Sequence, residues 1–296
     1  MLSQLNQQFS SPQVQFVEGE QGFIKAVISN TLATCEIYLH GANVTSFVPQ
    51  GQEDVFWVSK DVMFKAGKSI RGGIPVCWPW FGPHYSDASK GPHGFARLVQ
   101  WQVVSIDNTV DGATELVFGL SDNEATRALW PFKFDLQYKV RVAQQLTVTL
   151  TTNNRNDFDI QISEALHSYF AIGDINQTSL NGLDGVSYFD AMADRQIVTQ
   201  ADDITVDQEV DRVYFDTQDS CLLNDDNNQR TIRIGKSGSD STIVWNPWID
   251  KALSMPDVND DGYQQFICVE TGNALKNVVT IEAGQQHSIS QIIGLE

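Results

Sequence analysis

The chain has 296 residues, 42% of them hydrophobic, and its formal net charge at pH 7 is -18. This apolar content is sufficient for a large core and argues against disorder, and the negative charge excludes non-specific attraction to nucleic acids and anionic membranes. A small anionic substrate would therefore need a local cluster of Arg or Lys side chains.

The cysteines and the N-terminal segment narrow the class further. The four cysteines occur singly, without a CxxC pair or histidines at metal-ligand spacing, which predicts free thiols and no metal site. Residues 1–15 lack the features of a signal peptide, and no run of about 18 apolar residues occurs. We expect a cytoplasmic protein.

Alternation of apolar and polar residues with a period of two recurs along the chain and predicts β-strands. A short polar turn between two of these runs, 132–142 and 146–152, indicates a hairpin. The density of strands predicts one all-β domain over residues 1–296, a large antiparallel β-sandwich. The predicted strands are 22–29, 35–39, 99–106, 115–120, 132–142, 146–152, 242–245, 266–270, 278–281 and 288–293.

Helix signals are few. Ser121 followed by Glu124 has the spacing of a capping box and predicts a short helix that Pro131 stops. Asp250 predicts the cap of a second short helix, which extends to Met255. The Asp-rich segment 202–226 and the Gly- and Ser-rich segment 235–240 are predicted to be exposed loops.

Two glycine-bearing segments contain candidate binding residues. In 69–84 (SIRGGIPVCWPWFGPH), Arg71 precedes two glycines and Trp80 belongs to an aromatic run that could form an apolar platform for a sugar ring. In 91–97 (GPHGFAR), His93 and Arg97 flank a glycine. If the two loops meet, Arg71 and Arg97 could offer forked donors to a phosphate. The alternatives are core aromatic residues and surface ion pairs.

Two further segments contain candidate catalytic residues. His167 lies in the aromatic segment 163–170 (SEALHSYF), where a lone histidine is more often a hydrogen-bonded core residue than a catalyst. Glu270 ends an apolar strand in 266–273 (FICVETGN), a position where a carboxylate is costly unless it is paired or functional. Segment 244–250 (VWNPWID) is similarly dense in aromatic residues.

Together, SIRGGIPVCWPWFG, HGFAR, LHSYF, VWNPW and ICVETGN resemble the glucose-6-phosphate 1-epimerase, or hexose-6-phosphate mutarotase, family of aldose 1-epimerase-like proteins. The five segments occur in order between residues 69 and 273, so chance agreement is improbable. The resemblance implies a galactose mutarotase-like supersandwich. Region 176–207 matches no motif of the family.

The resemblance also implies roles for individual residues. His167 and Glu270 take the catalytic positions, Arg71 and Arg97 hold the substrate phosphate, and Asp211 contacts the sugar; His93 lies near the pocket. The implied enzyme is an isomerase that interconverts the anomers of a hexose 6-phosphate, with glucose 6-phosphate as the expected substrate, and it needs no metal or cofactor. Glu270 is the expected base and His167 the expected acid. We expect a monomer whose only partner is the sugar phosphate.

Three other functions stay open at this point. A non-catalytic carbohydrate-binding module would keep the aromatic platform but would not need the pairing of His167 with Glu270. A glycosidase would use two carboxylates, so that Glu164 or Asp211 would have to partner Glu270. An aldose 1-epimerase for neutral sugars would not need the two arginines.

Overall fold

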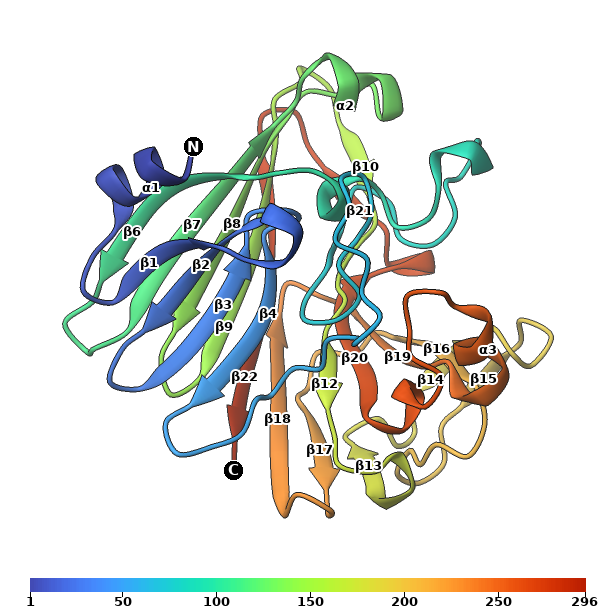
Figure 1. Cartoon of the computed structure of the whole chain (residues 1–296). Coiled ribbons are helices and arrows are strands. Elements are labelled where there is room, and N and C mark those ends of the chain that lie inside the picture. Colours follow the sequence, from blue (N-terminus) through green and yellow to red (C-terminus); the bar gives the residue numbers. More distant parts are fainter.

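Two eight-stranded sheets form the main layers of the molecule, and every strand pairing in them is antiparallel (Figure 1). The computed structural model describes all residues, 1–296. The site sheet has the order β15 (Ile197–Thr199), β14 (Ser187–Asp190), β16 (Val210–Phe215), β19 (Ser241–Asn246), β20 (Phe266–Asn273), β11 (Glu164–Leu166) and β5 (Val76–Cys77), and β12 (Tyr169–Ala171) also pairs with β20.

The second large sheet, here called the back sheet, carries half of the strands that alternation predicted. Its order is β13 (Thr178–Asn181), β17 (Cys221–Asp225), β18 (Arg230–Ser237), β22 (Gln286–Leu295), β9 (Leu146–Asn154), β8 (Phe134–Val142), β7 (Thr114–Ser121) and β6 (Gln102–Asn108). The predicted hairpin is confirmed, because β8 and β9 pair over their whole length.

Smaller elements complete the fold. A four-stranded N-terminal sheet, in blue in Figure 1, lies against the strands of the back sheet. It contains β1 (Val14–Glu18), β2 (Ile24–Ser29), β3 (Ala33–Tyr38) and β4 (Asn43–Pro49); β10 (Ile160–Ile162) and β21 (Val279–Ile281) form a separate pair. The helices are α1 (Leu2–Phe9), α2 (Glu124–Leu129) and α3 (Trp248–Ser254), with 3-10 turns at Glu20–Gly22, Ala88–Lys90, Ala96–Leu98, Ile175–Gln177, Gly262–Gln264 and Leu275–Asn277. None of these helices is both long and apolar enough to span a membrane.

The core lies between the layers, where alternate residues of each strand point inward. One cluster of 54 buried residues draws on the N-terminal sheet, the site sheet and the back sheet. Polar bonds also join the two large sheets: Ser168 Oγ donates to Gln291 Oε1 and Gln291 Nε2 donates to Val269 O. This shared core between antiparallel sheets is that of the predicted β-sandwich.

Both predicted helices exist, but the predicted caps were wrong. The capping box of α2 is formed by Asn123 and Thr126, whose side chains each accept the other's backbone N–H, and Ser121 ends β7 instead. Helix α3 begins at Trp248, so Asp250 lies in its first turn rather than at its N-cap. The local pattern identified the helices but misplaced the N-cap of α2 by two residues and that of α3 by three.

The predicted loops were also partly wrong. Segment 202–226 contains β16 and β17, and segment 235–240 begins with the last residues of β18. The aspartates of segment 202–226 include Asp225, which is fully buried and accepts a hydrogen bond from Arg230 Nε at 3.1 Å. Composition alone did not distinguish paired buried aspartates from solvated ones.

Candidate active site

The register of β20 brings His167 and Glu270 together. Leu166 pairs with Thr271 and Tyr169 pairs with Cys268, so the register runs on through the residues between β11 and β12 and sets His167 directly opposite Glu270. Directly opposed residues of antiparallel strands point to the same face. Both side chains therefore leave the site sheet on the face turned away from the back sheet.

These two side chains, here called the outer pair, approach each other without bonding fully. His167 Nδ1 lies 3.4 Å from Glu270 Oε1, and their side chains are 8% and 1% exposed. Neither His167 Nδ1 nor Glu270 Oε2 has a hydrogen-bond partner. Buried polar atoms without partners are rare in proteins and mark places where a ligand can supply the missing bonds.

The surroundings of the outer pair disfavour charge on both members. Burial, followed by the charge of Asp211, holds the pKa of Glu270 well above its usual range. Burial, followed by the nearby His93, Arg97 and Arg71, holds the pKa of His167 well below its usual range. Burial therefore opposes a negative charge on Glu270 and a positive charge on His167. Displaced pKa values of this kind are characteristic of acid–base sites.

Aromatic rings surround the outer pair on the same face. Residues two apart on a strand share a face, and Tyr169 stacks on His167 with ring centroids 4.8 Å apart and planes 6° apart. Trp245 lies on β19, opposite Cys268 of β20, and meets the imidazole edge-on, with the ring centroids 6.0 Å apart. These rings hold the imidazole in a fixed orientation.

Arg71 reaches the site from the glycine-rich loop before β5. A Cβ on Gly73, whose φ is +68°, would lie 2.0 Å from Val44 O, so the loop packs against β4 only with glycine there. Arg71 donates from Nε (3.1 Å) and Nη2 (2.9 Å) to Asp257 Oδ2 and from Nη1 to the Tyr169 hydroxyl (2.9 Å). Three of the five guanidinium N–H groups are thus used, and two stay free for a ligand.

Arg97 reaches the site from the second glycine-bearing loop. A Cβ on Gly94, whose φ is +67°, would lie 1.8 Å from Trp78 O, so this loop too requires its glycine. The Arg97 guanidinium donates from Nη2 to Pro92 O at 3.2 Å, and its buried Nε has no partner. Arg97 is therefore a cation without a carboxylate partner, beside the outer pair.

His93 lies between these groups. Its ring centroid is 5.9 Å from that of His167, and its Nδ1 accepts the Gly82 N–H at 3.3 Å. Burial, then Arg97 and Arg71, holds the pKa of His93 well below its usual range. A neutral ring that accepts at Nδ1 carries its proton on Nε2, so His93 can donate one hydrogen bond to a ligand.

Asp211 lies on the same face, two strands from Glu270. Asp211 lies on β16 and is opposite Trp245 of β19. Trp245 in turn is opposite Cys268 of β20. Burial raises the pKa of Asp211. The charge of Lys251 opposes this rise in pKa, and the charge of Asp190 adds to it. The structure thus brings together His167, Glu270, Arg71, Arg97, His93 and Asp211, as the sequence predicted.

Trp80 is placed differently. Its ring packs against His84 and Phe95 in the core, it is 4% exposed, and its indole N–H donates to Gly91 O. These contacts do not support the interpretation of Trp80 as a sugar platform. Trp245, which is partly exposed and meets His167 edge-on, is the aromatic ring available beside the outer pair.

A second buried histidine–glutamate pair, here called the inner pair, lies on the opposite face of the site sheet. Glu164 is opposite Asn273, three residues from Glu270, and therefore points toward the back sheet. Glu164 Oε1 lies 3.0 Å from Nε2 of His287, on β22. Glu164 consequently cannot act with Glu270 on one glycosidic bond.

The remaining reactive groups near the site are inert. All four cysteines are buried free thiols, and burial raises the pKa of Cys77 to about 12. Three or more His, Cys, Asp or Glu side chains do not gather anywhere in metal-binding geometry.

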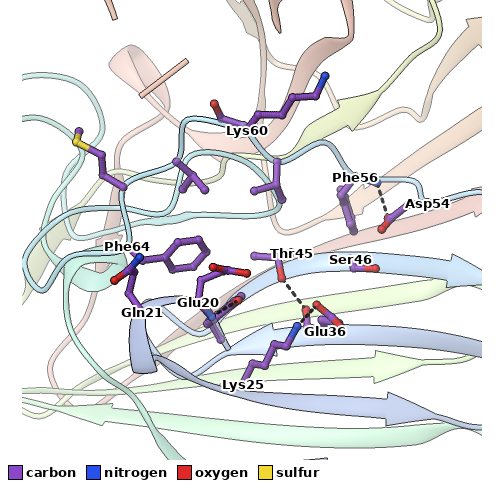
Figure 2. A pocket seen from close by; sticks show the side chains of 15 residues that line it. Glu20, Gln21, Lys25, Glu36, Thr45, Ser46, Asp54, Phe56, Lys60 and Phe64 are labelled. Carbon is purple, nitrogen blue, oxygen red and sulfur yellow. Dashed lines mark hydrogen bonds and ion pairs between the residues drawn. The ribbon is translucent and has the colours of Figure 1, made fainter. Parts of the chain in front are cut away.

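The largest cavity lies elsewhere. It measures about 870 Å³ and opens between the N-terminal sheet and the loop that follows β4 (Figure 2). Three of its charged side chains have partners within the protein: Lys25 pairs with Glu36 at 2.6 Å, and Asp54 accepts the N–H groups of Phe47 and Phe56. The next cavity, about 680 Å³, also lacks the outer pair. Volume alone would have pointed away from the acid–base groups.

Comparison with known proteins agrees with this geometry. The family model described as aldose 1-epimerase matches residues 25–294. The chain belongs to the aldose 1-epimerase family. It is 37% identical over 249 residues to an Escherichia coli K12 protein named "Putative glucose-6-phosphate 1-epimerase", covering 84% of this chain and 82% of that protein. A Cenchrus ciliaris protein of the same name is 31% identical, with 94% and 87% covered.

Solved structures show the same fold. A crystal structure of a protein described as "a putative mutarotase" from Salmonella typhimurium superposes on this chain with a TM-score of 0.89 at 31% identity. The superposition covers 96% of this chain and 94% of the other. A galactose mutarotase related enzyme from Lactobacillus acidophilus gives 0.73 at 16% identity, with 92% and 97% covered. The predicted galactose mutarotase-like β-sandwich is confirmed.

Sequence reasoning missed two residues of the site. Tyr169 could have been found, because residues two apart on a strand share a face with each other and His167 was already a candidate. Asp257 gave no signal, since it lies in the irregular segment after α3 and meets Arg71 only in the folded chain.

Proposed function

We propose that this aldose 1-epimerase family member interconverts the α and β anomers of a hexose 6-phosphate, with D-glucose 6-phosphate as its substrate. The observation that carries the proposal is the outer pair, unbonded and buried, with two guanidinium groups beside it. An acid–base pair serves sugar ring opening, and arginines serve a phosphate. The names of the E. coli and C. ciliaris relatives support the same substrate.

The reaction needs only proton transfers. In its carboxylate form, Glu270 removes the proton from the O1 hydroxyl while the C1–O5 bond breaks and protonated His167 delivers a proton to O5. The open-chain aldehyde rotates about C1–C2, and the reverse transfers close the ring on the other face. The Nε2–H of His93 and the carboxylate of Asp211 would hold sugar oxygens, and Trp245 would contact the apolar face of the sugar.

The cofactor, location and assembly follow as further parts of the proposal. Because no hydride moves and no covalent intermediate forms, the chain would act without a metal or organic cofactor. We propose that it works in the cytoplasm, as a monomer and as one domain over residues 1–296.

Exchange between the anomers of glucose 6-phosphate, followed by NMR with and without the protein, tests the proposal. We expect exchange well above the spontaneous rate and a much smaller acceleration for glucose. Equal acceleration of both sugars would identify an epimerase for neutral sugars. Binding of glucose 6-phosphate without faster exchange would identify a binding module, and both results would overturn the proposal.

A further inference from the structure

The backbone hydrogen bonds between the strands are incomplete beside the outer pair. The next opposed residues along the ladder are Ser168 and Val269. In a regular antiparallel ladder every second opposed pair exchanges two N–H···O bonds. Here the Val269 N–H donates to Ser168 O at 3.3 Å, but the Ser168 N–H turns away and donates to Leu166 O at 3.0 Å. Val269 O therefore lacks its partner from the ladder.

The side chain of Gln291 supplies the missing bond. Gln291 lies on β22 in the back sheet, and its Nε2 donates to Val269 O at 3.1 Å. Its Oε1 accepts a hydrogen bond from the Ser168 hydroxyl. One side chain of the back sheet thus joins the residue that follows His167 to the residue that precedes Glu270.

Gln291 is a polar residue in an apolar layer. It is fully buried, and so are Ile289 and Ile293, its neighbours on the same face of β22. Burying an amide costs free energy unless its polar atoms are bonded. Both polar atoms of the Gln291 side chain are bonded, and their partners are Ser168 and Val269. An aliphatic residue could fill this part of the core, but it could not join those two residues.

We propose that Gln291 is a positioning residue for the outer pair: by joining Ser168 to Val269, it sets the separation of the two side chains from the inner side of the site sheet. This inference rests on the proposed function. A direct bond does not set the separation, because His167 Nδ1 lies 3.4 Å from Glu270 Oε1 and has no hydrogen-bond partner. The aromatic rings orient the imidazole, and the backbone that Gln291 holds determines its distance from the carboxyl group.

His287 offers a comparison on the same strand. It also lies on β22 and reaches the site sheet, where its Nε2 is 3.0 Å from Glu164 Oε1. Glu164, however, is three residues from His167 in the chain and does not adjoin either member of the outer pair. Both Gln291 and His287 connect the two large sheets, so loss of either should cost stability. Only loss of Gln291 should slow the reaction.

The expected kinetic effect is on kcat rather than on KM. Arg71 and Arg97 lie on the loops before and after β5 and make no hydrogen bond to Gln291. Binding of a sugar phosphate should therefore be retained when Gln291 is replaced. Displacing reacting groups by about 1 Å can lower a rate about a hundredfold, even when the substituted residue is remote from the substrate.

The test compares Gln291→Met with His287→Ala in the whole protein. Gln291→Met removes both hydrogen bonds and keeps a side chain of similar length. Anomer exchange of glucose 6-phosphate is followed by NMR at a series of concentrations, corrected for the spontaneous rate, and urea unfolding gives the folded fraction of each variant. We expect kcat per folded molecule to fall roughly tenfold to a hundredfold in Gln291→Met, with KM within about twofold. His287→Ala should keep the kcat of the unaltered protein.

The outcomes separate this inference from the proposed function. An unchanged kcat in Gln291→Met, a rise in KM alone, or equal losses of kcat in Gln291→Met and His287→Ala would overturn the inference and leave the proposed function standing. Failure of the unaltered protein to accelerate exchange of glucose 6-phosphate would overturn the proposed function.

Ser168→Ala provides a second, milder variant. It removes the bond to Gln291 Oε1 and leaves the bond to Val269 O, so kcat should fall by about twofold to tenfold, the effect of one neutral hydrogen bond. Ser290→Ala is the matched control, because its hydroxyl bonds Thr149 Oγ1 at 2.8 Å on the other face of the back sheet. Equal kcat in Ser168→Ala and Ser290→Ala would overturn the inference, and this comparison decides it even where Gln291→Met fails to fold.

Discussion

The site sheet carries a buried histidine–glutamate pair on each of its faces, and the two pairs are built differently. The inner pair joins two sheets: Glu164 Oε1 meets His287 Nε2 at 3.0 Å and also accepts from Asn273 Nδ2 at 3.4 Å. The outer pair lies within one sheet, its nearest atoms are 3.4 Å apart, and an atom of each residue has no partner.

The difference separates a structural pair from a catalytic one. A histidine and a glutamate that bridge two layers stabilise their packing, since removing one leaves the other buried and poorly paired. One carboxylate oxygen has no partner in each pair, Glu164 Oε2 and Glu270 Oε2, but only in the outer pair is the histidine nitrogen that faces the glutamate unbonded as well. The outer pair therefore does less for stability and retains the capacity to bond a ligand at both residues. The two histidines also differ in exposure, since the side chain of His287 is 21% exposed and that of His167 is 8% exposed.

The largest expected effect is on catalysis. Glu270→Gln and His167→Asn should each lower turnover of glucose 6-phosphate by roughly a hundredfold to ten-thousandfold, because neither replacement can exchange a proton near neutral pH. The double variant should be little slower than the slower single, since the two residues form one proton relay. Anomer exchange measured by NMR, corrected for the spontaneous rate, gives these values.

Glu164→Gln is the matched control, with the same chemical change on the other face of the sheet. Its turnover per folded molecule should equal that of the unaltered protein. Loss of activity in Glu164→Gln comparable to that in Glu270→Gln would remove the distinction between the pairs.

The second prediction concerns the charges beside the outer pair. Arg97→Ala should weaken binding of glucose 6-phosphate by roughly one to two orders of magnitude, since a charge-assisted contact contributes about 1.5 to 3 kcal/mol. Binding of glucose should change far less. Calorimetry with both sugars measures the two affinities, and equal losses would show that Arg97 supports the site without recognising phosphate.

Much of the fold could be predicted from the sequence, because its causes are local. Period-two alternation gave the long strands of the back sheet, such as β8 and β9, whose inner and outer faces differ in polarity. It missed β16 and β17, where aspartates interrupt the pattern. Asp225 shows why: it is buried only because the strands pair and bring Arg230, on the next strand, against its carboxylate.

The site was predictable in its members but not in its geometry. The segments containing Arg71, Arg97, His167 and Glu270 were identified by composition and resemblance. That His167 lies opposite Glu270, and Glu164 does not share their face, depends on strand register, which no local pattern determines. Trp80 was misassigned because an aromatic run contains both core and surface rings.

The third prediction concerns stability and the inner pair. His287→Ala should lower the free energy of unfolding by about 1 to 3 kcal/mol, because Glu164 stays fully buried and loses its ionic partner. Turnover per folded molecule should not change. Urea unfolding measures the first quantity; an unaltered midpoint would mean that the inner pair contributes nothing to holding the sheets together.

The smallest effect is the pH dependence of stability, and it tests how the outer pair holds its proton. Unfolding returns Glu270 to a pKa of about 4.3 and His167 to about 6.5. Between these values the unfolded state holds a proton on His167 and none on Glu270, whereas burial in the folded state raises the pKa of Glu270 and lowers that of His167. The two shifts change the unfolding free energy of the unaltered protein with opposite dependence on pH, so they offset each other.

Single substitutions should expose opposite slopes between pH 4.5 and 6.5. In His167→Asn only Glu270 titrates, its folded pKa is raised, and the folded state binds the extra proton, so stability falls as pH rises. In Glu270→Gln only His167 titrates, its folded pKa is lowered, and the unfolded state binds the extra proton, so stability rises with pH. Each slope is at most about 1.4 kcal/mol per pH unit. The difference between the two variants cancels all other titrations. Parallel unfolding curves across this range would mean that the folded pair is ionised even without substrate, and the outer pair would then resemble an ordinary buried ion pair.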